Sequence, residues 1–298
     1  MERLIFGIIV LTASISSFAT GQRSDFIYVD GERWELLGQP ARANADLFNQ
    51  LLTVLPKDRI LTSADWNGYT AYWSITPDER LRLDSIQVQF GDKNNPLQYH
   101  CVSLPDEDML KVFQDYYHEV SAGEYSYQGI IAAWYTGEIR IARGKCLRYE
   151  HMGYLRNYEQ EQIFVLQQGK VISRKTFDNG VVVDGFSFDD NYHQNMIKEK
   201  IQFLVENYPE LVSDVADGSQ IRIIFNVSKI QVDSLGNLLD CKVEVPRIMG
   251  IEVDQDLKDR MAQDMKATLM NIRPWKILLI NGEYVSPKSV TIPYVIKR

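Results

Sequence analysis

Alternating apolar and polar residues, separated by turn-forming residues, dominate the first two thirds of the chain. The runs at 27–29 and 34–37 flank Asp30-Gly31, a pair that favours a two-residue turn, and so predict a β-hairpin. The runs at 66–75 and 81–90 flank a Pro-Asp-Glu turn and predict a second hairpin. Further strands, arranged as a meander, are predicted at 130–141, 147–149, 162–166 and 171–176.

Helical spacing is rare in this part of the chain. Leu47, Leu51 and Leu55 recur every four residues and predict a helix over 44–55. A shorter helix is predicted at 107–113. The first part of the chain is therefore expected to be a β-rich domain with few helices.

From about residue 190 the pattern changes to helix, strand, strand, helix, strand. Asp189 or Asp190 can cap the first helix, and the alternation over 219–227 predicts a half-buried strand. A tight turn at 281–283 leads to a terminal strand at 290–296. The apolar stripes of the two helices are Met196, Ile197, Ile201, Leu204 and Val205, and then Leu257, Met261, Met265, Leu269 and Ile272.

These patterns predict an α+β protein with two domains. A β-rich meander domain spans 23–188, and a domain of antiparallel strands with packed helices spans 190–298. The length of 298 residues exceeds one ordinary domain and agrees with this division.

The beginning of the chain has the order of an export signal. Glu2 and Arg3 precede an uncharged stretch at 4–18, and small residues follow it. At about 1.5 Å per residue this stretch spans roughly 22 Å, short of the roughly 30 Å hydrocarbon core. We predict a signal peptide over 1–21, cleaved between Ala19 and Gln22, and a periplasmic or secreted protein with no stable membrane span after cleavage.

Charge and composition narrow the possible partners. A formal charge of −8 argues against nucleic acid, because phosphate binding requires a basic face. Aromatic residues make up 11% of the chain, which fits a sheet-rich fold with aromatic contact surfaces.

Three cysteines leave an odd thiol in an exported chain. Cys101 and Cys146 are candidates for a disulfide within the first domain, and the alternative is that all three cysteines are buried apolar residues. Cys101 and Cys146, together with His100 and His151, could also meet at a zinc ion. A disulfide or unlinked thiols, with partly exposed histidines, is the favoured interpretation, and no metal or cofactor is predicted.

Two other groups of side chains are weak candidates for a catalytic or a binding site. Glu150 and His151 carry the functional groups of a general acid/base site, but a polar strand edge is the favoured interpretation, so no catalytic residue is predicted. The aromatic set of Trp66, Tyr69, Tyr72 and Trp73 could line a groove for carbohydrate or peptide. Alternation places Tyr69 and Trp73 on the opposite face from Tyr72, which favours a core role for part of the set.

The second part of the chain carries an ordered series of features that indicates a family. After the leading helix come Phe225-Asn226-Val227, Gly236-Asn237-Leu238 at the turn into a strand at 239–245, a helix over 254–271, Trp275, Asn281-Gly282-Glu283 and Thr291-Ile292-Pro293. In this order, residues 193–298 resemble the TonB C-terminal domain family. Segments of the first part are similar to uncharacterised bacterial exported proteins, a similarity that implies no function.

The resemblance implies two or three antiparallel strands with helices on one face, and binding of a protein or peptide partner in the envelope by addition of a strand to a sheet edge. The chain departs from the family in having no Pro-rich spacer and a longer segment between Phe225 and Gly236, so energy transduction is not expected. The alternative function is a cell-envelope glycan or cell-wall hydrolase using Glu150 and His151. The candidate binding edge consists of Val290, Thr291, Ile292, Tyr294, Val295 and Ile296.

Overall fold

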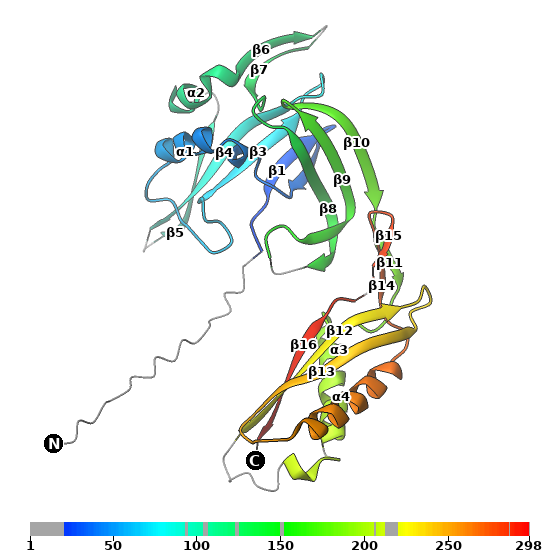
Figure 1. Ribbon diagram of the computed structural model, residues 1–298. Helices are drawn as coiled ribbons and strands as arrows, with labels where there is room; N and C mark the ends of the chain where they lie inside the picture. Colours follow the sequence, from blue (N-terminus) through cyan, green and yellow to red (C-terminus); the bar gives the residue numbers. More distant parts are fainter. Residues whose placement is uncertain are drawn as a thin grey trace, which may run out of the picture. The chain divides into compact units, whose positions relative to one another are not determined.

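The computed structural model describes residues 21–92, 95–103, 107–122, 125–149, 152–205, 207–211, 220–285 and 287–297 (Figure 1). The fold is mixed α+β, with mostly strands and mainly antiparallel sheets. The chain divides into two compact units. The first comprises Met1–Asn157 and Gln162–Lys175, and the second comprises Tyr158–Glu161 and Thr176–Arg298.

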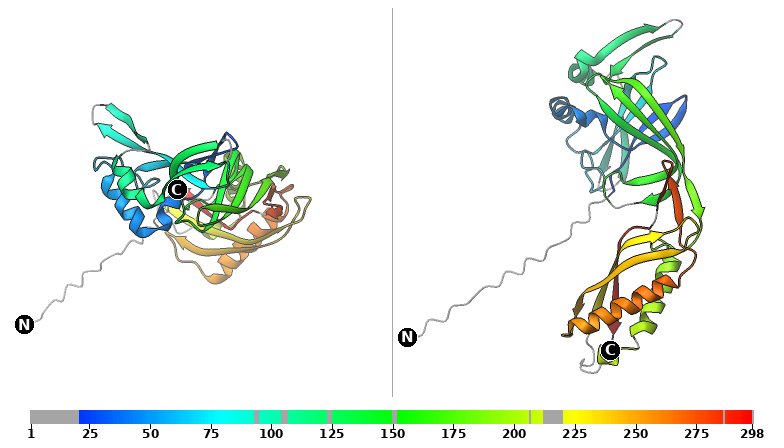
Figure 2. Two further views of the ribbon diagram at one scale, coloured as in Figure 1. Left: turned by 90° about the horizontal axis from the view of Figure 1, so that it is seen from above. Right: turned by 45° about the vertical axis from the view of Figure 1, so that its right-hand side comes forward.

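A ten-stranded sheet forms the framework of the first unit. Its order is β10-β9-β8-β2-β1-β3-β4-β7-β6, and β5 pairs with β4 off this path. Figure 2 shows this unit, coloured from blue through cyan to green, from two further directions. The strands are β1 (Asp25–Val29), β2 (Glu32–Leu36), β3 (Tyr69–Ile75), β4 (Leu81–Asp92), β5 (Asn95–Ser103), β6 (Tyr117–Ala122), β7 (Tyr125–Ile131), β8 (Gly137–Tyr149), β9 (Arg156–Gln167) and β10 (Lys170–Asp178).

Both predicted hairpins are confirmed. β1 and β2 pair antiparallel around Asp30 and Gly31, whose φ angles of 52° and 78° fit the turn that an Asp-Gly pair favours. β3 and β4 also pair antiparallel. Local sequence signals were sufficient for these elements because the two strands of a hairpin are neighbours in the chain.

The predicted meander is confirmed for β8, β9 and β10, which are successive neighbours in the sheet, but it is wrong for the first unit as a whole. β1 pairs with β3 in parallel, with Phe26 opposite Tyr72, and β2 pairs with β8, with Leu36 opposite Ile141. The helix and loops between β2 and β3 provide the crossover that a parallel pair requires. The strands at the C-terminal end of the first unit thus return to the sheet beside its first hairpin.

At one end of the first unit the sheet curls so far that the start of β4 contacts the turn between β9 and β10. The Leu81 amide donates to the Gly169 carbonyl oxygen over 2.8 Å, and the Val171 amide donates to the Glu79 carbonyl oxygen over 2.8 Å. Arg80 and Lys170 form an antiparallel bridge between these bonds. The start of β4 is therefore joined to the turn between β9 and β10, and the inner face of the sheet is enclosed there.

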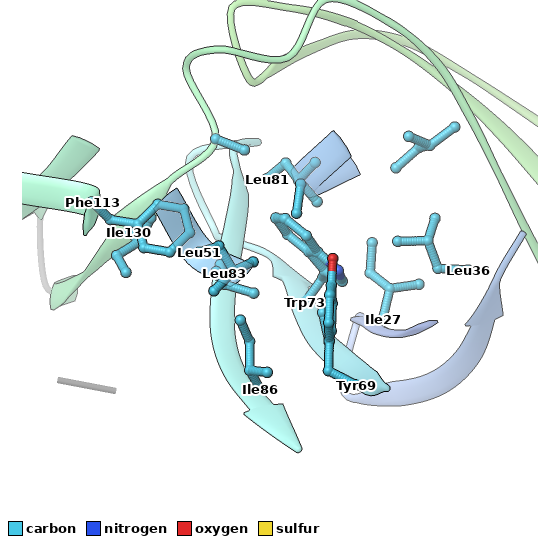
Figure 3. Packing of buried hydrophobic residues seen from close by; sticks show 14 of the residues in the cluster. Ile27, Leu36, Leu51, Tyr69, Trp73, Leu81, Leu83, Ile86, Phe113 and Ile130 are labelled. Carbon is cyan, nitrogen blue, oxygen red and sulfur yellow. The ribbon is translucent and has the colours of Figure 1, made fainter. Parts of the chain in front are cut away.

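Apolar side chains from the inner face form the core of the first unit. Trp73 and Phe164 are fully buried in it. The short helices contribute Leu51 and Phe113, which are drawn with Trp73 in Figure 3. The predicted helices are confirmed as α1 (Ala45–Val54) and α2 (Glu107–Phe113), accompanied by the 3-10 turns η1 (Pro40–Ala43) and η2 (Gln114–Tyr116). The Asn44 side chain caps α1 by accepting from the Leu47 amide over 3.0 Å.

The described residues of the second unit form two α-helices and two three-stranded sheets. One sheet has the order β13-β12-β16, and the other has the order β11-β14-β15 (Figure 1). The elements are β11 (Gly180–Val183), α3 (Asn191–Val205), η3 (Pro209–Leu211), β12 (Gln220–Val232), β13 (Leu238–Met249), α4 (Gln255–Met270), β14 (Ile277–Ile280), β15 (Glu283–Val285) and β16 (Val290–Lys297).

Both helices of the second unit begin and end close to their predicted limits. Asp190 accepts from the Tyr192 and His193 amides at the start of α3, and Asp254 accepts from the Leu257 amide at the start of α4. Their apolar stripes form one core with the buried residues of β12 and β13. Every second residue of β12 from Ile221 to Val227 is buried in this core. Because every second side chain of a strand lies on the same face, α3 and α4 cover one face of the sheet.

Two boundaries differ from those expected. The segment after Phe225 is no long turn, because β12 continues to Val232 and pairs with β13 as far as Leu238. The second unit also begins before residue 190, because β11 pairs with β14. In the first case, bulges in the β12–β13 hairpin interrupt the alternation that would have marked the rest of the strand. In the second case, the paired strands lie far apart in the sequence, so local periodicity does not indicate their pairing.

Candidate functional site

The terminal strand β16 forms an edge of the sheet that α3 and α4 cover. It pairs with β12 through eight consecutive residue pairs, from Gln220 with Lys297 to Val227 with Val290, and the ladder has no register shift. In the described part of the chain, no strand pairs with its other side. The candidate edge residues thus lie on an edge strand with a regular ladder.

The opposite edge of this sheet is less regular. β13 pairs with β12 through a ladder that contains three register shifts, between Ile224 and Asn226, between Ser228 and Gln231, and between Gln231 and Val232. Each edge strand contains one proline, Pro246 in β13 and Pro293 in β16, so the bulges are what distinguishes the two edges. Bulges protect an edge against pairing with another strand. Of the two edges, β16 is therefore the better site for pairing with an added strand.

Side chains of β16 alternate between the two faces of the sheet. Val290, Tyr294 and Ile296 are half-buried, Ile292 is buried, and all four belong to the core beneath the helices. The exposed residues Thr291, Pro293 and Val295 point to the face without helices. The Thr291 hydroxyl donates to the Asn226 side-chain oxygen over 3.0 Å on that face.

A polar cluster in the first unit was missed by the sequence patterns. The Asp25 carboxyl is buried, and it accepts hydrogen bonds from the Ala71 amide over 3.0 Å and from the Trp73 indole nitrogen over 3.2 Å. Burial raises the pKa of Asp25 to about 7, which the two hydrogen bonds only partly oppose. An acidic residue at the first position of a strand has no local feature that predicts such burial.

The neighbours of Asp25 share its exclusion from water. The Tyr69 hydroxyl is buried and has no hydrogen-bond partner among the described residues. Burial also raises the pKa of Tyr69 and that of Asp65. The Asp65 carboxyl accepts from the Gly68 amide over 2.9 Å. The adjoining hollow holds only about 10 Å³, too little for a substrate, so we assign these groups a structural role.

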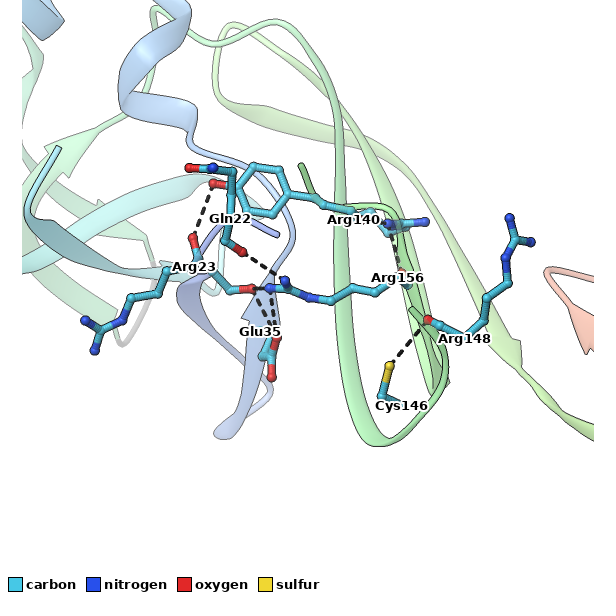
Figure 4. Close-up of polar contacts among 9 residues, drawn as sticks. Gln22, Arg23, Glu35, Arg140, Cys146, Arg148 and Arg156 are labelled. Atoms are coloured by element: carbon cyan, nitrogen blue, oxygen red, sulfur yellow. Dashed lines mark hydrogen bonds and ion pairs between the residues drawn. The ribbon is translucent and has the colours of Figure 1, made fainter. Parts of the chain in front are cut away.

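The segment that precedes β1 is bonded into the first unit by Arg156. Its guanidinium donates to the Gln22 carbonyl oxygen over 2.9 Å and to the Ser24 hydroxyl, and it lies 3.5 Å from the Glu35 carboxylate (Figure 4). The Gln22 amide donates to the Gly153 carbonyl oxygen over 2.8 Å. Residues 1–20 of the signal predicted over 1–21 lie outside the described residues, and the folded unit already includes the chain from Gly21 onward.

The aromatic set divides between core and surface. Trp73 is fully buried and Tyr69 is 2% exposed, which confirms the core interpretation for these two residues. Tyr72 lies on the other face, stacked on Phe26 with ring centroids 5.5 Å apart. Trp66 is 67% exposed. The four rings therefore do not line one groove.

The remaining sequence candidates are not brought together. Glu150 and His151 lie outside the described residues, and so do the side chains of His100 and Cys101, so the hydrolase and zinc interpretations are not tested. Cys241 is buried, but Cys146 is exposed, which corrects the expectation that all three cysteines are buried. The Cys146 thiol donates to the Arg148 carbonyl oxygen over 3.3 Å. Within the described residues no cluster of three metal-ligating side chains occurs.

A groove of about 540 Å³ lies between α3 and α4. Its lining includes Glu199 and Lys200 from α3 and Asp264 and Thr268 from α4. Asp264 accepts a 2.6 Å hydrogen bond from the Tyr208 hydroxyl, and Thr268 donates to the Asp264 carbonyl oxygen. Charges of both signs and side chains bonded within the chain make this groove a weaker candidate than the β16 edge.

Comparison with protein-family models gives no match, and comparisons with curated proteins and with solved structures give none either. The resemblance to TonB C-terminal domains therefore stays a prediction from the sequence. No helix in the described ranges is both long and apolar enough to cross a bilayer.

Proposed function

We propose that the chain is a binding protein of the cell envelope, and that its second unit holds an extended segment of a protein partner against β16. One observation carries the proposal: β16 is an edge strand whose ladder with β12 is regular over eight residue pairs. An extended segment can continue such a sheet, with main-chain hydrogen bonds supplying affinity and alternate side chains supplying selectivity. The proposal requires no catalytic residue, metal or cofactor.

Pro293 limits how the partner binds. It has no amide hydrogen, and it lies opposite Ile224 near the middle of the ladder. A partner strand therefore gains no hydrogen bond from the Pro293 nitrogen. Pairing would depend on the residues on either side, Val290 to Ile292 and Tyr294 to Lys297. This arrangement favours a reversible complex over permanent sheet extension.

Site-specific photo-crosslinking in living cells tests the proposal. In two variants a photoreactive residue replaces Thr291 or Val295, which are exposed on β16. A third variant, with the photoreactive residue at Leu239, is the matched control, because Leu239 is 59% exposed on β13. Because paired strands are aligned residue by residue, both β16 positions should react with one segment of one partner. The two partner residues should be as far apart as Thr291 and Val295 are in this chain.

The control position defines the opposite result. Leu239 should give little product with that segment, because it lies on the irregular edge. If Leu239 gave the dominant product, or if the two β16 positions reacted with unrelated segments, strand addition at β16 would be wrong.

Export is part of the proposal, and its support comes from the order of charged, apolar and small residues over 1–21. Cell fractionation followed by N-terminal sequencing is the test. We expect a periplasmic or secreted protein that begins between Thr20 and Gln22. A full-length chain retained in the cytoplasm would contradict export without affecting the strand edge.

A further inference from the structure

The helix-free face of the β13-β12-β16 sheet carries two arginines that form no ion pair in the described part of the chain. Arg222 on β12 and Arg247 on β13 are both exposed. The register places Arg222 opposite Met249 and Ile224 opposite Arg247, so the arginines are diagonal neighbours on one face. Like charges in this position repel each other, which makes the face receptive to an anion.

Nearby acidic groups do not neutralise this face. Glu244, the acidic residue on the same part of β13, forms a 2.6 Å ion pair with Lys242. Three uncharged residues of β16, Thr291, Pro293 and Val295, are exposed on this face. Lys297 follows them at the same alternation, opposite Gln220, and carries a positive charge. In a chain with a formal charge of −8, this face thus has a local excess of positive charge.

The register also shows which arginine a partner at β16 can reach. Val295 lies directly opposite Arg222. A strand added beside β16 would lie about 10 Å from β12, which is two strand spacings. The extended side chains of an arginine and a glutamate together bridge that distance across the small Val295 side chain. Arg247 lies one strand farther away, beyond β12.

We propose that the strand bound at β16 carries an acidic residue opposite Val295, and that Arg222 recognises it by an ion pair. This inference rests on the proposed function of the same edge. The neighbouring positions extend the pattern: an apolar residue opposite Pro293 contacts the surface formed with Ile224, and a polar residue opposite Thr291 lies near Asn226. The partner is thus an acidic, alternating peptide segment.

A tethered strand tests the inference without knowledge of the partner. The full chain is extended after Arg298 by a Gly-containing turn and a short strand of alternating Val and Thr, which has Glu, Gln or Lys opposite Val295. Tethering raises the effective concentration of the strand, so weak pairing becomes measurable. Hydrogen exchange of β16, followed by mass spectrometry, reports the paired fraction.

We expect protection of β16 to follow the order Glu, Gln, Lys. The equilibrium for pairing should be about two- to five-fold more favourable with Glu than with Gln, as expected for an exposed ion pair, and the difference should shrink at high salt. Arg222→Gln should abolish the preference. Arg247→Gln is the matched control, with the same loss of charge on the same face, and it should leave the preference intact.

The possible failures are distinguishable. Equal protection by the Glu and Lys strands would overturn the acidic preference and leave strand addition standing. Loss of the preference in Arg247→Gln but not in Arg222→Gln would also overturn the inference, because it would place the added strand beside β13. Absence of protection with all three strands would instead contradict the proposed edge itself.

Discussion

The carboxyl group of Asp25 accepts a 3.2 Å hydrogen bond from the indole nitrogen of Trp73 inside the first unit. Its other oxygen accepts from the Ala71 amide. Asp25 begins β1, and both donors belong to β3, so one side chain reinforces the parallel pairing of these strands. Because the Asp25 carboxyl is buried away from water, its ionisation is unfavourable, and the stability of the first unit should depend on pH.

Stability of the first unit should fall as pH rises from about 4 to about 7. Burial raises the pKa of Asp25 from 3.8 to about 7 in the folded chain, so the folded state binds this proton more tightly than the unfolded state. The resulting stabilisation is complete below the unfolded pKa and is lost as pH rises through the folded pKa, by about 4 kcal/mol at most. Urea unfolding, followed by tryptophan fluorescence across this range, measures it.

Asp25→Asn should remove this dependence. At pH 5 we expect the variant to be less stable, because its amide group cannot accept both hydrogen bonds. Above pH 7 the difference should narrow, since the wild type must then ionise a buried carboxyl. Asp30→Asn, at an exposed carboxylate, is the control. A stability difference between Asp25→Asn and the wild type that is constant with pH would contradict the assignment.

Tyr69→Phe should be neutral or stabilising by about 1 kcal/mol, because it removes a buried hydroxyl that has no partner among the described residues. Tyr72→Phe, on the same strand, is the matched control, since the Tyr72 hydroxyl donates to Gln87 over 2.8 Å. The control should lose about 1 kcal/mol. A clear loss of stability in Tyr69→Phe would show that its hydroxyl has a partner, such as a buried water.

Gly169→Ala should destabilise the first unit more than Gly31→Ala does. Both glycines have positive φ, 74° and 78°, so each substitution strains the backbone by about 1 kcal/mol. A Cβ atom on Gly31 would meet nothing within 4 Å, whereas one on Gly169 would lie 2.6 Å from the Ala132 carbonyl oxygen. That clash should add about 1–3 kcal/mol. Equal losses in denaturant titrations would argue against the closed end of the sheet.

The limits of the second unit can be tested with two fragments. Residues 176–298 include β11, which pairs with β14, whereas residues 190–298 lack it. We expect both fragments to be soluble, and the longer one to unfold at higher denaturant concentration with a steeper transition, because more surface is buried. Identical transitions would mean that β11 does not contribute to the stability of this unit.

The elements that could be predicted from the sequence are those fixed by near neighbours. The predicted cap at Asp190 and the turn at Asp30-Gly31 each involve residues a few positions apart. The turn at 281–283 and the residues that follow it likewise predicted a terminal strand at 290–296, which is β16.

The remaining features depend on pairing between distant segments. Nothing near Phe26 indicates that Tyr72 lies beside it in a parallel pair, and nothing near Leu36 indicates Ile141. The burial of Asp25 follows from the same non-local pairing. For the candidate site, the sequence indicated the edge strand, but the contrast with β13 and the position of Arg222 required the register.

The central claim is that β16 receives a partner strand, and hydrogen exchange on the complex tests it most directly. The partner segment identified by crosslinking is added to the full chain as a synthetic peptide, and exchange is compared over 290–297 and 238–249. The account predicts slower exchange in β16 and no change in β13. Binding that leaves exchange in β16 unchanged, or that slows it in β13 instead, would contradict the account.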